Sequence, residues 1–209
     1  MNRRIVLASG NTGKLAELRG LLDGSDIELV AQGELGIGDA EETGWTFIEN
    51  AILKARHAAR ASGLPALADD SGLCVDVLGG APGLYSARYA GVHGDNDANN
   101  ARLLRELDGV PDEKRTAHFT CVLALLRSAD DPDPILATGR WSGRVLAAPR
   151  GEHGFGYDPV FLPDDGNGLG AAELEPALKN RISHRGMALG RLRDTLFPSP
   201  FGRGCPKGG

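Results

Sequence analysis

Short apolar segments alternate along the chain with segments whose leucines recur every three or four positions. Residues 5–8 and 27–31 are apolar runs of strand length, and between them Leu15, Leu18 and Leu22 have helical spacing. A change of period from two to about 3.6 is the primary signal of a change from strand to helix. The pattern therefore predicts a strand, a polar turn, a helix and a second strand within the first 31 residues.

A second helix is predicted to begin after Thr46. Thr46 and Glu49 have the spacing of a capping box, in which each side chain bonds to a backbone N–H that the helix leaves unpaired. One apolar face would consist of Ile48, Ala51, Ile52 and Ala55. Gly63 and Pro65 then predict where the helix ends.

The remaining elements continue the interleaving of strands and helices. Strands are predicted from residue 66 and through the alternating Leu73, Val75 and Val77, then at 116–126 and 135–145, and helices at 97–107 and after Ser183. Gly139 is a candidate hairpin turn inside the last strand segment. A strand–turn–strand stretch in the middle favours an α/β protein with a mixed sheet over a purely doubly wound one. We expect one domain over residues 1–197 and a disordered, Pro- and Gly-rich tail over 198–209.

Composition narrows the class of protein. The 209 residues carry 23 Lys and Arg against 28 Asp and Glu, a net charge of −5, which argues against a protein that tracks nucleic acid. No run of 18 apolar residues exists, so we expect no membrane span. Three cysteines without metal-type spacing indicate a reducing, cytoplasmic setting. Glycine is unusually frequent, at 30 residues, and its positions matter below.

The first polar turn is a candidate phosphate-binding loop. It consists of Ser9, Gly10, Asn11, Thr12, Gly13 and Lys14, between the first strand and the first helix. Free backbone N–H groups, the positive end of a helix and a lysine together suit a phosphate. Two residues separate the glycines and Leu15 follows the lysine, so this is not a Walker A loop. A tight turn with a solvated lysine remains the alternative.

Two pairs of adjacent acidic residues are candidates for metal or proton chemistry. Asp69 and Asp70 lie in the apolar segment that begins at residue 66, and Glu41 and Glu42 precede the capped helix. Neighbouring strand residues point to opposite faces, so the two aspartates are expected to have different roles, one in a metal or general-base site and the other capping a turn. Carboxylates from separate segments are the ligands that Mg²⁺ takes together with phosphate oxygens.

Three further segments contain candidate ligand-binding residues. Residues 78–89 are glycine-rich and end in aromatics, and residues 154–159 place Phe155 and Tyr157 among glycines. Lys179, His184 and Arg185 put cations near a helix N-terminus, where the helix dipole disfavours them unless an anion is close. A corner turn, core aromatics and a neighbouring carboxylate are the structural alternatives. Taken together, the segments fit a small nucleotide better than other ligands.

In this order the segments make the chain recognisable. The chain resembles the inosine/xanthosine triphosphate pyrophosphatase family at residues 9–14, 41–44, 46–51, 68–72, 78–89, 154–159 and 183–186. The resemblance implies an elongated mixed α/β fold with two lobes around a central cleft, and a homodimer. It also implies Mg²⁺-dependent hydrolysis of ITP, dITP and XTP to the monophosphate and pyrophosphate.

The resemblance also implies roles for individual residues. Residues 9–14 would hold the triphosphate, Glu41 and Asp70 the metal, and Asp70 would accept a proton from water. The remaining substrate contacts would come from Ser71, Phe155, Gly156, Tyr157, Asp158, Lys179, His184 and Arg185. Phe155 is the ring expected over the base.

Three other functions are weighed against this one. The first is a pyrophosphatase for modified pyrimidine or standard deoxynucleotides. The second is a nucleotide sensor without catalysis, against which the presence of both Asp70 and Glu41 weighs. The third is a nucleic-acid-binding protein, which the net charge disfavours.

Overall fold

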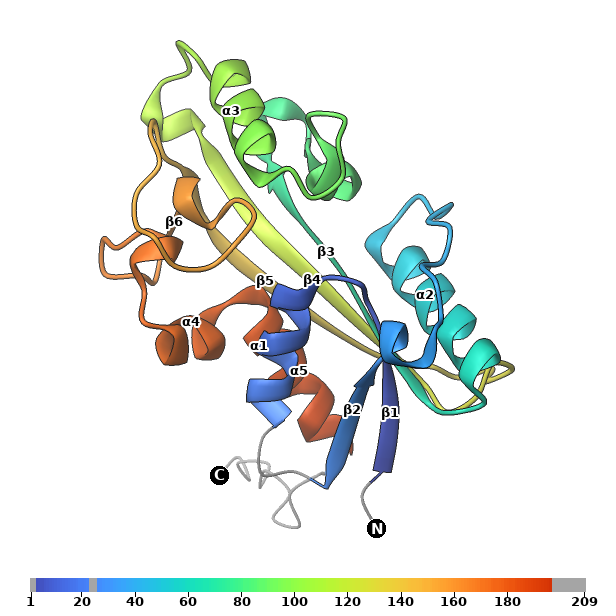
Figure 1. The fold of residues 1–209 in the computed structure, drawn as a ribbon. Coiled ribbons are helices and arrows are strands. Elements are labelled where there is room, and N and C mark those ends of the chain that lie inside the picture. The colour runs from blue at the N-terminus through green and yellow to red at the C-terminus, as the bar shows by residue number, and fades with distance from the viewer. Residues whose placement is uncertain (1–2, 23–25, 197–209) are drawn as a thin grey trace, which may run out of the picture.

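The computed structural model describes residues 3–22 and 26–196, which build one mixed six-stranded sheet with helices on both faces (Figure 1). The strands are β1 (Arg3–Ala8), β2 (Ile27–Ala31), β3 (Ala66–Val75), β4 (Thr116–Leu126), β5 (Ile135–Val145) and β6 (Phe161–Pro163). Their order is β2-β1-β3-β4-β5-β6, with β1 parallel to β2 and β3 and every later pair antiparallel. The predicted α/β class with a mixed sheet is confirmed.

The described residues also form five α-helices, of which the last two follow β6. They are α1 (Thr12–Leu22), α2 (Phe47–Ser62), α3 (Asn96–Glu106), α4 (Pro176–Ile182) and α5 (His184–Leu196). Short 3-10 turns occur at η1 (Gln32–Leu35), η2 (Asp76–Leu78), η3 (Gly83–Arg88), η4 (Asp112–Lys114), η5 (Asp158–Val160) and η6 (Ala171–Glu173). No helix in the described ranges is long and apolar enough to cross a bilayer. The tail expected to be disordered, 198–209, lies outside the described residues.

Helix α2 forms where its sequence signals place it. Thr46 Oγ1 accepts a hydrogen bond from the Glu49 backbone N–H at 3.2 Å, and the Glu49 carboxylate accepts from the Trp45 N–H at 2.8 Å. Gly63 ends the helix in the left-handed region at φ 68°. Its buried residues are Asn50 and four alanines, and the small alanines let the helix pack closely against the sheet.

Two expectations about strands are wrong. Val77 lies beyond the end of β3, in η2, and is 48% exposed, because the chain turns away from the sheet after Val75. Gly139 is not a hairpin turn, since β5 runs through it and pairs it with Cys121 of β4. A Cβ at residue 139 would overlap the His184 carbonyl oxygen, so this glycine permits the close approach of α5.

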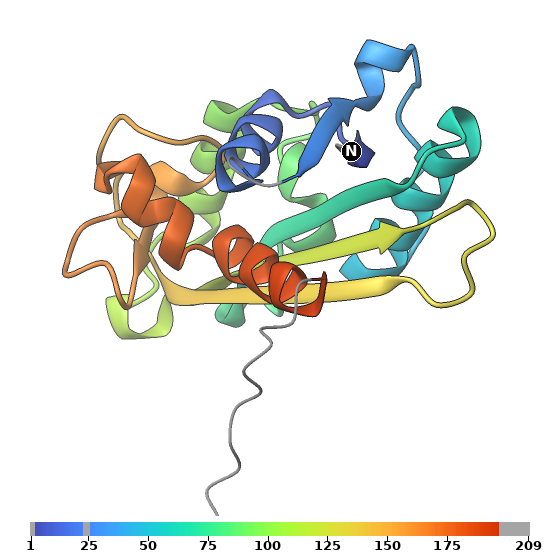
Figure 2. The same ribbon diagram turned by 90° about the horizontal axis from the view of Figure 1, so that it is seen from below.

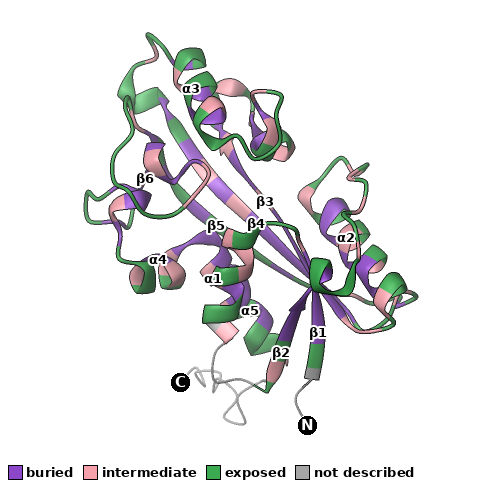
Figure 3. Cartoon of the chain, in the orientation of Figure 1, coloured by how far each residue is buried: buried purple, intermediate pink, exposed green. Residues whose placement is uncertain are grey.

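The apolar core has two parts joined by the long strands β3, β4 and β5. One part surrounds Leu73, Phe119 and Trp141, towards α3 and β6. The other part lies nearer β1, as two layers, one under α1 and α5 on one face and one under α2 on the opposite face. Figure 3 shows the buried positions along the sheet, and Figure 2 shows α5 and α2 on its two sides. Polar residues of β3 lie between the two parts.

Strand β3 has a neighbouring strand on both sides at its start and on only one side further along. It pairs with β1 at Ala66–Ala68 and with β4 along its whole length. From Asp69 onwards, β1 has ended and the chain has turned into the 9–11 loop. Residues 69–71 therefore lie on a free strand edge beside that loop.

Candidate active site

The loop after β1 is held by its own side chains. The Asn11 backbone N–H donates to Ser9 Oγ at 3.2 Å, and the Lys14 backbone N–H donates to Asn11 Oδ1 at 3.0 Å. Thr12 begins α1, and a Cβ on Gly13 would lie 2.8 Å from the Phe155 ring. The predicted loop thus sits at a helix N-terminus and touches the aromatic loop of residues 154–158.

Asp69 is the centre of a buried ion cluster on the face of the sheet that α1 and α5 cover. Lys14 Nζ lies 2.5 Å from Asp69 Oδ1, and Arg185 Nε donates to Asp69 Oδ2 at 2.8 Å. The hydroxyl of Ser71 and the thiol of Cys121 donate to the same carboxylate at 2.8 and 3.3 Å. Burial raises the pKa of Asp69, but Arg185 and Lys14 outweigh it and hold the pKa well below its usual value. Asp69 therefore stays ionised.

Asp70 points to the opposite face, as strand alternation predicts. Lys54 Nζ of α2 lies 2.5 Å from Asp70 Oδ1 and 3.0 Å from Glu42 Oε1, and Arg88 lies 3.3 Å from the other oxygen of Glu42. Burial raises the pKa of Asp70 despite Lys54, whereas Lys54 and Arg88 outweigh burial at Glu42 and lower its pKa. A carboxylate with a raised pKa is a better proton acceptor near neutral pH. Neither aspartate caps a turn, so that expectation is wrong.

Of the two acidic residues before α2, Glu42 lies in the site and Glu41 lies on the surface. Glu42 shares Lys54 with Asp70, whereas Glu41 is exposed and forms no ion pair with any described residue. The sequence cannot separate these neighbours, because a loop gives no periodicity from which to read direction. The structure brings Glu42 to Asp70, and a role for Glu41 in metal binding stays a prediction.

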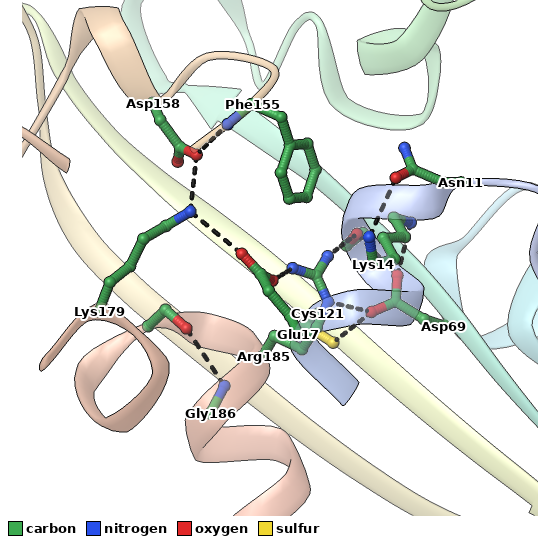
Figure 4. A network of polar contacts seen from close by, with 12 residues as sticks. Asn11, Lys14, Glu17, Asp69, Cys121, Phe155, Asp158, Lys179, Arg185 and Gly186 are labelled. Atoms are coloured by element: carbon green, nitrogen blue, oxygen red, sulfur yellow. Dashed lines mark hydrogen bonds and ion pairs between the residues drawn. The ribbon is translucent and has the colours of Figure 1, made fainter. Parts of the chain in front are cut away.

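A second group of charges joins α1, α4 and α5 (Figure 4). Lys179 Nζ lies 2.7 Å from Asp158 Oδ2 and 3.1 Å from Glu17 Oε1, and Arg185 binds the other oxygen of Glu17. The Phe155 ring faces these cations, its centroid 5.2 Å from Lys179 Nζ and 5.7 Å from Arg185 Cζ. The anion expected near this helix N-terminus is thus supplied by protein carboxylates.

Glu17 and Lys54 are site residues that the sequence analysis missed. Glu17 stands three residues after Lys14, one turn further along α1, so helical spacing from the lysine was an available signal. Lys54 faces the sheet from α2, and only the packing of that helix against β3 reveals its partner. Its position in an otherwise apolar face offered no local signal.

Two predicted substrate contacts are anchored in the core. The Tyr157 hydroxyl donates to the Ser86 carbonyl oxygen at 2.9 Å, and the residue is buried. The His184 ring is buried and stacks on Phe119, with centroids 4.7 Å apart and planes 9° apart. Burial and the nearby Arg185 lower the pKa of His184 well below its usual value, so the ring is neutral. Gly156, at φ 64°, links Phe155 to Tyr157.

The residues that face Lys54 suit a hard divalent cation. Two carboxylates, Glu42 and Asp70, already converge on one positive centre at 3.0 and 2.5 Å. The described residues contain no group of three or more His, Cys, Asp or Glu side chains that could hold a metal by themselves. Few protein carboxylates, completed by water and phosphate oxygens, are what Mg²⁺ usually takes.

The fold and the site define an α/β protein whose polar centre lies at the free edge of β3. The chain belongs to the Ham1 family, whose model matches residues 5–195. This confirms the family expected from the motifs. A dITP/XTP pyrophosphatase of Xanthomonas campestris pv. campestris is 59% identical over 194 residues, covering 93% of this chain and 97% of that one.

Other relatives also match over nearly their whole length. A dITP/XTP pyrophosphatase of Escherichia coli O157:H7 is 56% identical over 195 residues, 93% of this chain and 98% of that one. The solved structure of a HAM1 protein from Coxiella burnetii has a TM-score of 0.85 at 48% identity, covering 93% and 98% of the two chains. The Staphylococcus aureus Ham1 protein has a TM-score of 0.81 at 39% identity, with the same coverage.

Proposed function

We propose that this protein hydrolyses the deaminated purine nucleoside triphosphates ITP, dITP and XTP to the monophosphate and pyrophosphate. The observation that carries the proposal is the split of Asp69 and Asp70 across the two faces of a free strand edge. Asp69 gathers cations on one face, and Asp70 meets a second carboxylate on the other. The names of relatives 56–59% identical to this chain support the same reaction.

The triphosphate is proposed to bind at the N-terminus of α1. Lys14 and the backbone N–H groups of residues 10–13 would meet the phosphate oxygens, an arrangement that favours anions. Lys14 is paired with Asp69, so phosphate and Asp69 would share this lysine. Because Asp69 also binds Arg185, its charge stays compensated when Lys14 turns towards the phosphate.

Asp70 is proposed to bind Mg²⁺, together with a carboxylate of the Glu41–Glu42 pair. The bound ion would neutralise charge on the phosphate oxygens. Alanine variants of each glutamate decide between them. We expect Glu42→Ala to raise the Mg²⁺ concentration needed for half-maximal rate at least tenfold, because Glu42 faces Asp70 across Lys54. The same increase in Glu41→Ala, with Glu42→Ala unchanged, would restore Glu41 as the ligand.

Asp70 is also the proposed proton acceptor. A water oxygen bonds to the α-phosphorus while one proton passes to the Asp70 carboxylate, and the bond to the bridging oxygen breaks as pyrophosphate leaves. Burial raises the pKa of Asp70, which brings it closer to the pH at which it must take the proton. Lys54, 2.5 Å away, orients the carboxylate.

The base is proposed to stack on Phe155, beside Lys179 and Arg185. Hypoxanthine and xanthine carry an oxygen at position 6 where adenine carries an amino group. A donor directed at that oxygen would face another donor in adenine, and a polar site left unpaired in this way can discriminate by about 10⁴. Gly156, Tyr157, Asp158 and His184 would shape this half of the site.

A substrate panel tests the proposal. ITP, dITP, XTP, ATP, GTP, dUTP and dTTP are incubated with Mg²⁺, and pyrophosphate, orthophosphate and nucleotide products are measured. We expect pyrophosphate and IMP from ITP. IDP with orthophosphate indicates a phosphatase, preferred cleavage of dUTP or dTTP indicates the pyrimidine alternative, and tight binding without cleavage indicates a sensor; each contradicts the proposal.

The proposed setting is a cytoplasmic homodimer that acts on small nucleotides and binds no nucleic acid. Light scattering coupled to gel filtration measures the mass, for which we expect twice that of the chain. Retention of oligonucleotides that falls steeply with salt would indicate a nucleic-acid partner instead.

A further inference from the structure

Helix α3 carries two adjacent buried asparagines that bond to different segments. Asn99 donates to the Ala87 carbonyl oxygen at 3.3 Å and accepts from the Ala90 N–H at 2.6 Å. Asn100 donates from Nδ2 to the Gly156 carbonyl oxygen at 2.9 Å. Its Oδ1 is buried and has no hydrogen-bond partner among the described residues. Asn99 therefore has partners for both its amide oxygen and its amide nitrogen, whereas Asn100 has one only for its nitrogen among the described residues.

The segment that Asn100 holds is the one that carries Phe155. Within it the Phe155 N–H donates to Asp158 Oδ2 at 2.8 Å, and the Tyr157 hydroxyl donates to Ser86. Between these two anchors lies Gly156, at φ 64°. The Asp158 N–H also donates to the Phe155 carbonyl oxygen at 3.3 Å, which closes the turn, and the bond from Asn100 ties the Gly156 carbonyl of that turn to α3.

An unpaired buried amide oxygen usually costs stability, and such a group in a native protein requires an explanation. Gly156 is only half-buried, so water could satisfy its carbonyl if Asn100 were absent. An apolar residue of the same size would therefore fit this position at least as well for folding. The stability of α3 does not account for Asn100, but the geometry of residues 154–158 does.

We propose that Asn100 is a positioning residue for the nucleoside half of the site, holding the 154–158 loop so that the Phe155 ring faces Lys179 and Arg185. The proposal rests on the proposed function, in which this loop meets the base. It places no demand on the phosphate half, because Asn100 bonds to none of the residues around Asp69 or Asp70. Loss of Asn100 should weaken binding of the nucleoside and leave binding of the phosphates unchanged.

Asn100→Leu tests this with two ligands. The variant keeps the number and branching of the heavy side-chain atoms and removes both the donor and the unpaired oxygen. KM for ITP and the inhibition constant for inorganic tripolyphosphate, which has no base, are measured alongside the melting temperature. We expect KM to rise roughly tenfold, the size expected for one lost hydrogen bond with its alignment, and the tripolyphosphate constant to stay within about twofold. The melting temperature should be equal or higher.

Asn99→Ala is the matched control, since it removes a neighbouring buried amide that holds residues 87–90 instead. We expect it to lower the melting temperature without the selective rise in KM. Equal changes for ITP and tripolyphosphate in Asn100→Leu, or no change in either, would overturn the proposal. If Asn100→Leu does not fold, Asn100→Ser, which is too short to reach Gly156, must give the same selective loss. A wild-type protein that binds tripolyphosphate but neither binds nor cleaves ITP refutes the proposed function itself.

Discussion

The negative charge of Asp69 should contribute more to the free energy of unfolding than the charge of any exposed carboxylate. Its side chain is fully buried, and so is nearly all of the Arg185 side chain, with Lys14 only 16% exposed. Asp69→Asn preserves the shape but leaves two buried cations without their shared anion. Removing one partner of a buried ion pair costs about 3–5 kcal/mol. Because Arg185 retains Glu17, we expect the lower end, about 3 kcal/mol.

Thermal unfolding measures this loss. For a chain of this length, each kcal/mol corresponds to about 2–4 °C, so the melting temperature should fall by about 6–12 °C. Asp164→Asn is the control, because Asp164 is exposed and forms no ion pair with the described residues, and it should melt within about 2 °C of wild type.

Added tripolyphosphate should reverse part of the loss. In Asp69→Asn the anion no longer competes with Asp69 for Lys14, so its stabilising effect should exceed that in wild type. An unchanged melting temperature together with an equal gain from tripolyphosphate would show that Asp69 does not hold these cations.

The stability difference between wild type and Asp69→Asn should depend on pH. The pKa of Asp69 is lower in the folded protein than in the unfolded chain, so its contribution is complete above the unfolded pKa of about 3.9. It is lost as the pH falls from there towards the folded pKa. The stability difference between wild type and Asp69→Asn should therefore be constant from pH 5 to 8 and shrink below about pH 4. A difference that grows on acidification contradicts the ion cluster.

Three further predictions concern the reaction and the fold. Asp70→Asn should fold normally and lower kcat by roughly 10²–10⁴, as measured by pyrophosphate release, and near-normal turnover would remove Asp70 from the mechanism. EDTA should abolish turnover, and excess Mg²⁺ should restore it, because the proposed reaction needs the ion to neutralise charge on the phosphate oxygens. The lowered pKa of His184 means that stability falls as the pH drops below the unfolded value of about 6.5. Urea unfolding of His184→Gln between pH 7 and 5 should show a shallower fall, and an equal fall would place the proton elsewhere.

Local signals were sufficient where the physics is local. Thr46, Glu49 and Gly63 define α2 because caps and a left-handed terminus act within a few residues. Asp69 and Asp70 could be assigned to opposite faces because alternation is a property of any strand. These features needed no knowledge of the tertiary fold.

The remainder depends on contacts between distant segments. In the sequence, Gly139 resembles a turn residue. In the fold, its lack of a side chain is what permits α5 to pack against β5. Lys54 acquires its role only when α2 lies on β3. His184 is expected at the ligand from the family resemblance and from its place beside Arg185 at a helix N-terminus; its ring stacks on Phe119, and its contact with substrate stays a prediction. Sequence alone gave the elements and the candidate chemistry, and packing decided which side chains meet.

The position of Asp69 and Asp70 on consecutive residues of one strand has a consequence for how this gene can change. Substitutions affect one face at a time, but an insertion or deletion of one residue at the start of β3 would turn every following side chain to the other face. An insertion would put Asp69 in the place of Asp70, opposite Lys54, and a deletion would put Asp70 in the place of Asp69, opposite Lys14 and Arg185. Length variation among relatives should accordingly concentrate in the loops and spare this strand, whose residue count is as much a part of the site as its carboxylates.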